Sequence, residues 1–183
     1  MARIRSEPRR ARARGAEPDL DLPVRACLFS GQSNEAPMTV TIRPIRPDDR
    51  DQWMPLWQGY LTFYETTLPD AVSETTFARL CDPARAHQRG LVADDDGRLV
   101  GFVNVIFHAH NWKLEEVTYL QDLFAAPDTR GTGVGRALIE AVYEMADDNG
   151  TPTVYWMTQH FNATARQLYD RIGSLTPFVK YSR

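Results

Sequence analysis

A run of glycines at a strand-to-helix junction is the part of this sequence best suited to bind a ligand. The loop reads Thr129-Arg130-Gly131-Thr132-Gly133-Val134-Gly135-Arg136, between an apolar run ending at Ala125 and an amphipathic run reaching Met145. The first turn of a helix leaves backbone N–H groups without partners and carries the positive end of the helix dipole. Because glycines let an anion approach this backbone closely, the loop predicts a site for phosphate or diphosphate.

Two common phosphate-binding motifs do not match this loop. A nucleotide P-loop needs a Gly-Lys pair followed by Ser or Thr, and no such pair stands near it. A dinucleotide fingerprint needs a small residue three positions after its second glycine, where this chain has Arg136 or Leu138. The ligand is therefore expected to be a phosphate-bearing molecule of another kind.

Carboxylates near the preceding strand are candidates for acid–base chemistry. Asp122 stands inside the apolar run 117–125, and Glu115 and Glu116 directly precede that run. Side chains alternate along a strand, so Asp122 is expected on the opposite face from Gln121 and Leu123. Asp122 has two open interpretations: a catalytic group that binds a substrate ammonium or orients a water, or a structural carboxylate.

Two histidines are further candidates. His108 and His110 flank one residue beside Trp112, so both rings share a face if the strand there continues. No third ligand has a suitable spacing, and Cys27 and Cys81 fit no zinc or C-x-x-C pattern, so no metal is predicted. If one histidine faces an amine, it is a candidate for the general base.

The elements that must position these residues follow from the hydrophobic pattern. We expect an α+β domain with one mainly antiparallel mixed sheet, in the order β-α-α-β-β-β-α-β-α-β. Turn and cap signals are Asp96-Gly97 in a hairpin, Ser73 and Asn162 as helix caps, and Gly150 and Gly173 as helix ends. The expected strands span 40–45, 91–93, 99–107, 117–125, 154–158 and 178–181, and the expected helices span 47–64, 73–80, 134–149 and 162–173.

Length and charge limit the domain count and the partners. The chain has 183 residues, of which 43% are hydrophobic and 25% charged, as in one globular domain. Residues 1–14 hold six arginines, and residues 1–37 are predicted to be a disordered extension before a domain at 38–183. That domain has 14 basic and 19 acidic residues, which favours cationic substrates over nucleic acid. No apolar stretch approaches the ~20 residues that cross a bilayer, so a reduced cytoplasmic protein is expected.

The motif R-x-x-G-x-G, formed by Arg130, Gly133 and Gly135, resembles the acetyl-CoA-binding motif of the GNAT N-acetyltransferase superfamily. The resemblance extends over 38–183 and includes the Thr41-Ile42-Arg43-Pro44 strand, the Leu120-Gln121-Asp122-Leu123-Phe124 strand, and Asn162 followed seven residues later by Tyr169. The segment from Asn162 to Asp170 is most similar to the branches that acetylate polyamines, amino acids and histone-type amines. This resemblance implies the GNAT fold and acetyl-CoA as co-substrate.

The resemblance also assigns roles to residues. It implies that Tyr169 is the general acid for the departing thiolate, and Asp122 is the carboxylate we assign to catalysis. Relatives of the polyamine type often have Glu where this chain has Gln121, which weakens the case for a carboxylate base at that position. The cofactor-binding set comprises Leu123, Phe124 and Ala125 for the pantetheine arm, the loop Arg130, Gly131, Thr132, Gly133, Val134, Gly135 and Arg136 for the diphosphate, and Asn162 and Ala165.

The resemblance implies an N-acetyltransferase that transfers acetyl to a primary amine by direct attack in a ternary complex. The acceptor classes left open are a small cationic amine, an amino acid, a polyamine and a lysine side chain. One alternative is a catalytically silent acyl-CoA-binding sensor, and another is an acetyltransferase whose arginine-rich leader binds RNA. A homodimer joined through the apolar segment 178–181 is also expected, by analogy with the family.

Overall fold

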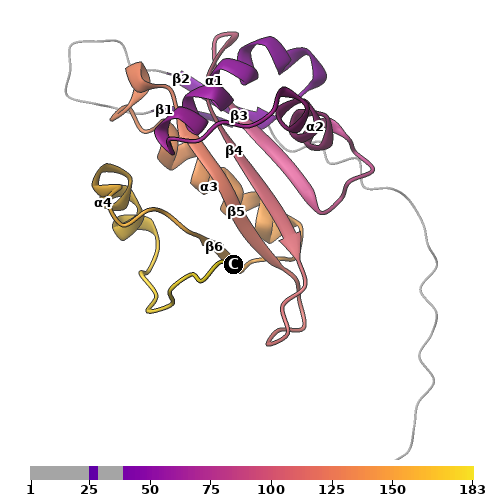
Figure 1. Ribbon diagram of the computed structural model, residues 1–183, viewed down its shortest axis with the longest axis vertical. Helices are drawn as coiled ribbons and strands as arrows, with labels where there is room; N and C mark the ends of the chain where they lie inside the picture. Colours follow the sequence, from indigo (N-terminus) through magenta and orange to yellow (C-terminus); the bar gives the residue numbers. More distant parts are fainter. Residues whose placement is uncertain (1–24, 29–38) are drawn as a thin grey trace, which may run out of the picture.

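One six-stranded sheet organises the computed structural model, which describes residues 25–28 and 39–183 (Figure 1). Its strands lie in chain order, and every neighbouring pair is antiparallel except the parallel pair β5 and β6. The strands are β1 (Arg25–Leu28), β2 (Thr39–Pro44), β3 (Gln88–Asp95), β4 (Arg98–His108), β5 (Val117–Ala125) and β6 (Val154–Trp156). The mainly antiparallel mixed sheet predicted from the sequence is confirmed.

Helices cover both faces of this sheet (Figure 1). Helices α1 (Arg50–Phe63) and α2 (Asp70–Cys81) pack on one face, and α3 (Val134–Asp148) packs on the other. Helix α4 (Ala163–Ile172) follows β6, and short 3₁₀ turns, η1 (Pro47–Asp49) and η2 (Pro127–Thr129), precede α1 and the glycine loop. Among the described residues, no helix combines the length and apolarity of a membrane span.

The hairpin between β3 and β4 turns where the sequence predicted it. Asp96 and Gly97 have φ of 50° and 89°, so both central residues lie in the left-handed region, as a tight hairpin turn requires. The two strands then pair from Asp95 and Arg98 back to Gln88 and Ile106. This pairing places the apolar residues of β4 in the centre of the sheet.

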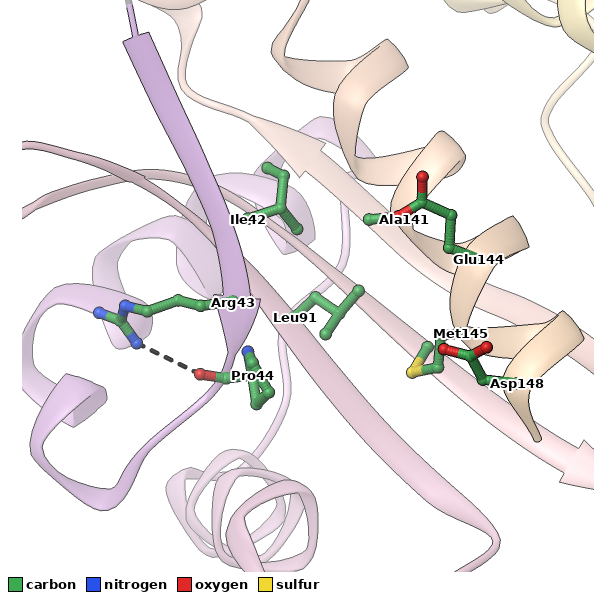
Figure 2. Close-up of a pocket in the computed structure, with 8 residues that line it drawn as sticks. All are labelled: Ile42, Arg43, Pro44, Leu91, Ala141, Glu144, Met145 and Asp148. Atoms are coloured by element: carbon green, nitrogen blue, oxygen red, sulfur yellow. Dashed lines mark hydrogen bonds between the residues drawn. The ribbon is translucent and has the colours of Figure 1, made fainter. Parts of the chain in front are cut away.

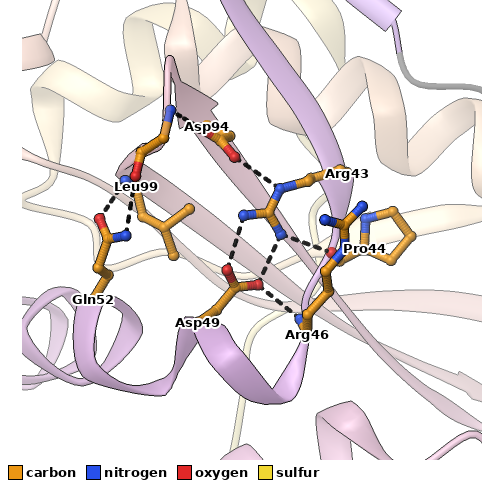
Figure 3. A network of polar contacts seen from close by, with 8 residues as sticks. Arg43, Pro44, Arg46, Asp49, Gln52, Asp94 and Leu99 are labelled. Atoms are coloured by element: carbon orange, nitrogen blue, oxygen red, sulfur yellow. Dashed lines mark hydrogen bonds and ion pairs between the residues drawn. The ribbon is translucent and has the colours of Figure 1, made fainter.

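An ion-pair network holds the start of α1 against the sheet (Figure 3). The guanidinium of Arg43 on β2 donates to both carboxylate oxygens of Asp49 over 2.8 Å and to Asp94 on β3 over 2.8 Å. The Arg46 backbone N–H donates to the same Asp49 carboxylate over 2.7 Å. Burial raises the pKa of Asp49, but the hydrogen bonds from Arg43 and Arg46 outweigh it and leave the pKa below its usual value. Asp49 is thus a buried carboxylate whose counter-charge is supplied by the fold.

A bulge in β5 and the short length of β6 open the sheet on one side. Asn104 of β4 pairs with Asp122 and Val105 pairs with Leu120, so Gln121 is an extra residue with no partner. β6 pairs with β5 only as far as Leu120, opposite Trp156. Beyond the bulge, no strand in the described part of the chain lies beside the outer edge of β5.

Three elements differ from the sequence predictions. Ser73 does not cap a helix, because α2 begins earlier, at Asp70 after Pro69; Ser73 is buried and accepts a 3.0 Å hydrogen bond from the indole of Trp57. A strand, β1, forms at Arg25–Leu28 inside the segment expected to be disordered, since it pairs with β2. The rest of that segment, including the arginine-rich residues 1–14, lies outside the described residues.

The predicted final strand over 178–181 is wrong. Residues after Gly173 form no helix or strand, and the side chains of Phe178, Val179 and Tyr181 are 78%, 72% and 90% exposed. Among the described residues this segment pairs with no strand, and its apolar alternation alone does not make one.

Candidate active site

The glycine loop presents backbone donors without partners at the start of α3. Gly131 and Gly133 have φ of 83° and 98°, values that favour glycine. The first hydrogen bond between successive turns of α3 is from the Ala137 N–H to the Gly133 carbonyl, over 3.0 Å. The N–H groups of Val134, Gly135 and Arg136 therefore have no acceptor within the helix, and no side chain caps it. This arrangement fits a diphosphate, whose oxygens would accept from these groups.

The two arginines of the loop differ in their surroundings. Arg136 donates through Nε to Glu140 over 2.8 Å, one turn further along α3. Arg130 forms no ion pair with any described residue and borders a groove of about 430 Å³ between α1 and the end of β5. The groove is lined by Pro55, Leu56, Gly59, Thr62, Phe63, Phe124, Pro127 and Arg130. Arg130 is thus the cation that remains available beside the glycine loop.

The three β5 residues assigned to the pantetheine arm lie beyond the bulge, on the open edge of the strand. Leu123 and Ala125 are half-buried, whereas the ring of Phe124 is buried against α1. A Cβ atom added at Gly59 would lie 2.8 Å from this ring, so helix and strand are in close contact there. The backbone of the segment is therefore accessible to a ligand, while the Phe124 side chain belongs to the core.

Asp122 is the buried carboxylate at this bulge. It is 7% exposed and accepts hydrogen bonds from the Tyr60 hydroxyl over 2.8 Å and from Nδ2 of Asn104 over 3.1 Å. Burial raises the pKa of Asp122, and the two hydrogen bonds offset only part of that effect. No described Lys, Arg or His forms an ion pair with it. Asp122 and Leu123 lie on opposite faces, as expected, since Asp122 bonds Tyr60 of α1 and Leu123 packs against the cluster that includes α3, whereas Gln121 is the exposed extra residue of the bulge.

Tyrosines surround this carboxylate. Burial first, and then the charge of Asp122, raise the pKa of Tyr60 and of Tyr119 on β5. Burial also raises the pKa of Tyr64 at the end of α1, where a hydrogen bond with Thr158 lowers it and the charge of Asp122 raises it by less. Tyr155 on β6 pairs with Tyr119, and the two rings stack with centroids 4.9 Å apart. Tyr60, Tyr119 and Tyr155 were not predicted from the sequence to lie at the site. Regular alternation would place Tyr119 on the strand face opposite Asp122, and the bulge at Gln121 brings both to the same face. The partner from β6 follows only from strand pairing.

Tyr169 lies on α4 against the indole of Trp156, with ring centroids 5.5 Å apart. Burial, with a smaller contribution from Tyr64, raises the pKa of Tyr169 to about 12, so the hydroxyl stays protonated at neutral pH. No hydrogen bond joins this hydroxyl to any described residue. The charge of Asp122 contributes to raising the pKa of Tyr64, and Tyr64 contributes to raising the pKa of Tyr169, so both predicted catalytic residues lie near Tyr64.

Asn162 caps α4, as predicted. Its Oδ1 accepts from the Ala165 N–H over 3.4 Å, while its Nδ2 donates to the hydroxyl of Thr158 over 3.1 Å. Both ends of the amide are therefore occupied by the protein. Ala165 is half-buried on the same first turn.

The remaining candidate bases lie on both sides of the point where β4 ends. β4 stops at His108, so His110 lies in the following connection, where its Nδ1 accepts from the Trp112 N–H. Glu115 and Glu116 are exposed in the same connection. His108 alone remains on the sheet, and its Nε2 lies 2.9 Å from the Tyr155 hydroxyl. Within the described part of the chain, no three His, Cys, Asp or Glu side chains come together as a metal site.

A second hollow lies away from this region, between β2, β3 and α3 (Figure 2). It encloses only about 40 Å³ and is lined by Ile42, Arg43, Pro44, Leu91, Ala141, Glu144, Met145 and Asp148. It is too small for an acetyl donor or an amine of several heavy atoms, and it lies on the face of the sheet opposite Asp122. The tyrosine-lined bulge is therefore the better candidate site.

Comparisons with known proteins identify the family. Residues 51–173 match the model of the acetyltransferase (GNAT) family. The chain is 40% identical over 157 residues to the D-amino-acid N-acetyltransferase HPA3 of Saccharomyces cerevisiae, an alignment that covers 82% of this chain and 98% of that protein. It is also 29% identical over 147 residues to the uncharacterized N-acetyltransferase YhfO of Bacillus subtilis, covering 78% and 95%.

Solved structures share the fold. The aminoglycoside acetyltransferase AAC(6')-Iy, in complex with a bisubstrate analogue, superposes with a TM-score of 0.69 at 20% identity, over 79% of this chain and 97% of that one. A ribosomal-protein-alanine N-acetyltransferase from Brucella melitensis gives a TM-score of 0.64 at 22% identity, over 79% and 98%. The chain therefore belongs to the acetyltransferase (GNAT) family and is an acetyl-CoA-dependent N-acetyltransferase.

Proposed function

We propose that the enzyme acetylates the primary amine of a small cationic acceptor, with free amino acids as the first class to test. The observation that carries this proposal is Asp122, a buried carboxylate with neutral donors on two sides and no described counter-cation. An acceptor ammonium would supply that missing positive charge. The tyrosine faces around Asp122 favour the same ligand, because aromatic rings attract cations. Similarity to a D-amino-acid N-acetyltransferase supports an amino acid as acceptor.

Acetyl-CoA supplies the activated acetyl group, and we propose that residues of α3, β5 and α4 hold it. The free N–H groups at the start of α3, with Arg130, would bind the diphosphate, and the open β5 edge at Leu123 to Ala125 would pair with the pantetheine amides. Asn162 and Ala165 would line the arm from the first turn of α4. Gly133 keeps the approach to the helix start clear of a side chain.

In the chemical step, Asp122 holds the acceptor and Tyr169 acts as general acid. The buried Tyr169 hydroxyl is protonated at neutral pH and has no competing partner among the described residues, so it can donate to the departing thiolate. We propose direct attack of the amine in a ternary complex. Cys81 on α2 is a poor nucleophile because burial raises its pKa to about 11.

A panel of acceptors tests the proposal. Purified enzyme is incubated with acetyl-CoA and D- and L-amino acids, polyamines or a lysine peptide, while thiol release and acetylated product are both measured. We expect product with amino acids and unchanged rates for Cys81→Ser. Tight binding of CoA without product from any amine would instead identify the chain as an acyl-CoA sensor.

We further propose that two copies associate through the segment 178–181. Phe178, Val179 and Tyr181 are exposed there, and β6 offers an edge with no further strand among the described residues. Light scattering on wild type and Phe178→Asp is expected to give a dimer and a monomer, respectively. A monomeric wild type would overturn this proposal.

A further inference from the structure

His108 and Tyr155 form a polar pair that the roles above leave unused. Nδ1 of His108 lies 2.9 Å from the Ala109 carbonyl, and its Nε2 lies 2.9 Å from the Tyr155 hydroxyl. A carbonyl oxygen can only accept, so Nδ1 carries the proton in the neutral ring. Nε2 is then a lone-pair acceptor, and the Tyr155 hydroxyl donates to it. The pair is therefore oriented to move a proton from Tyr155 to His108.

The pair lies on the same face of the sheet as Asp122. Asn104 and Asp122 face α1 together, and two residues further along β4 comes the row in which Ile106, Tyr119 and Tyr155 are paired. His108 follows at the end of β4, on the same side as Ile106. A row spacing of about 7 Å follows from the rise of a strand, so Tyr155 lies one row from the carboxylate with Tyr119 between them, and His108 lies one row further along.

The reaction needs a proton acceptor other than Asp122. An amine arrives as ammonium and must lose a proton before it attacks a carbonyl carbon. A carboxylate that pairs with the ammonium stabilises the protonated form, so Asp122 binds the acceptor but opposes that loss. Histidine is the side chain that ordinarily changes charge near neutral pH. Half-buried at a strand end, His108 can pass a proton on to solvent.

We propose that the acceptor ammonium loses its proton to the oxygen of Tyr155 as Tyr155 passes its own proton to Nε2 of His108. This inference rests on the proposed function. The N–H bond of the ammonium breaks and an O–H bond forms on Tyr155, while the original O–H bond breaks and an N–H bond forms on His108. The products are a neutral amine, a neutral Tyr155 and a His108 imidazolium, which releases the proton to water. Tyr155 is the catalytic residue, and His108 acts through it.

The groups around the pair are compatible with this role. Tyr119 from β5 stacks on Tyr155, and the ring of Tyr155 packs edge-on to His108 at 5.9 Å. Asp122 and Tyr64 both raise the pKa of Tyr119, the residue whose ring stacks on Tyr155. In the following connection, His110 is bonded to Trp112 and Lys113 to Glu115, over 3.2 and 3.9 Å. No described carboxylate forms an ion pair with His108, so its imidazolium is not held against release of the proton.

Three matched variants test the pair. Tyr155→Phe keeps the ring stacked on Tyr119 but removes the hydroxyl, His108→Gln removes the titrating ring, and His110→Gln changes the neighbouring histidine outside the sheet. We expect Tyr155→Phe and His108→Gln to lower kcat at pH 7 by about 10²-fold, as for loss of a positioned base, with KM for acetyl-CoA unchanged. Because the acceptor becomes neutral by itself in alkaline solution, both variants should recover as pH rises towards 10. His110→Gln should match wild type.

The pH profile separates this role from a structural one. A variant that is merely misfolded would stay slow at every pH, whereas a missing proton acceptor is specifically rescued by high pH. Wild-type profiles for both Tyr155→Phe and His108→Gln, in an enzyme that acetylates amines, would overturn the pair and leave the proposed function standing. Failure of wild type to acetylate any amine would overturn the proposed function and the pair with it.

Discussion

The substitution Asp122→Asn should separate function from stability. Asp122 and Asp49 are equally buried, with 7% and 6% exposure, yet their surroundings are opposite. Asp49 accepts two hydrogen bonds from the Arg43 guanidinium and one from a backbone N–H, whereas Asp122 has only a hydroxyl and an amide as donors. Asp49→Asn is therefore the matched control for the same chemical change.

The structure gives opposite signs for the two variants. Asp49→Asn leaves Arg43 without its main buried partner, and breaking such a pair costs about 3–5 kcal/mol. For Asp122, burial raises the pKa because it penalises the charged form, so removing the charge relieves that penalty and should not lower the free energy of unfolding. In a chain of this size 1 kcal/mol moves Tm by about 2–4 °C. We expect Tm to fall by roughly 10 °C in Asp49→Asn and not to fall in Asp122→Asn.

Activity should show the reverse order. Losing a charge-assisted hydrogen bond to the acceptor ammonium is worth about 1.5–3 kcal/mol, or about 10- to 100-fold in kcat/KM for the amine. The KM for acetyl-CoA should not change in Asp122→Asn. Asp49→Asn, assayed well below its Tm, should retain its activity. Thermal unfolding followed by circular dichroism and steady-state kinetics of both variants are the measurements.

The pH dependence of stability provides an independent test of the opposite effects expected for the two variants. Because the pKa of Asp122 is raised in the folded state, its stabilising contribution is full below the unfolded value near ~4 and is lost as pH rises through the folded value. The free energy of unfolding of Asp122→Asn should thus exceed that of wild type at neutral pH, and this difference should disappear in acid. Asp49 has a lowered pKa, so wild type should exceed Asp49→Asn at neutral pH and lose that advantage as pH falls through the folded pKa. Equal losses of Tm in both variants would refute our reasoning and make Asp122 structural.

Two further substitutions test the donor side of the site. Tyr169→Phe should lower kcat by about 10²-fold or more, because the half-buried Tyr169 carries the proposed general acid. Stopped-flow measurement of thiol release would show this loss. An unchanged kcat would remove Tyr169 from the mechanism. Gly133→Ala should raise KM for acetyl-CoA by about 10-fold, since φ of 98° costs a residue with a Cβ about 1–2 kcal/mol. Calorimetric titration with CoA measures that effect, and wild-type affinity would show that the loop conformation is not needed for binding.

The sequence was most informative where the structure depends on local backbone preferences or on the alternation of side chains along a strand. The paired signals of Asp96-Gly97, the span of β5 and the start of α3 could be predicted, because glycine conformation and side-chain alternation are local properties. Local signals failed at Ser73, where a buried indole took the hydroxyl that was expected to cap a helix. They also failed at 178–181, because a strand needs a neighbour that no local pattern supplies.

The candidate site divides in the same way. The sequence by itself predicted a phosphate-bearing ligand at the glycine loop and opposite faces for Asp122 and Leu123, because glycines at a helix start and alternation along a strand are local features. Only the tertiary structure decided that Tyr60 from α1 and Asn104 from β4 hydrogen-bond that carboxylate without any described cation, and that β6 brings Tyr155 to His108. The physical reason is that these partners lie up to 62 residues apart in the chain, and their meeting depends on how helices and strands pack.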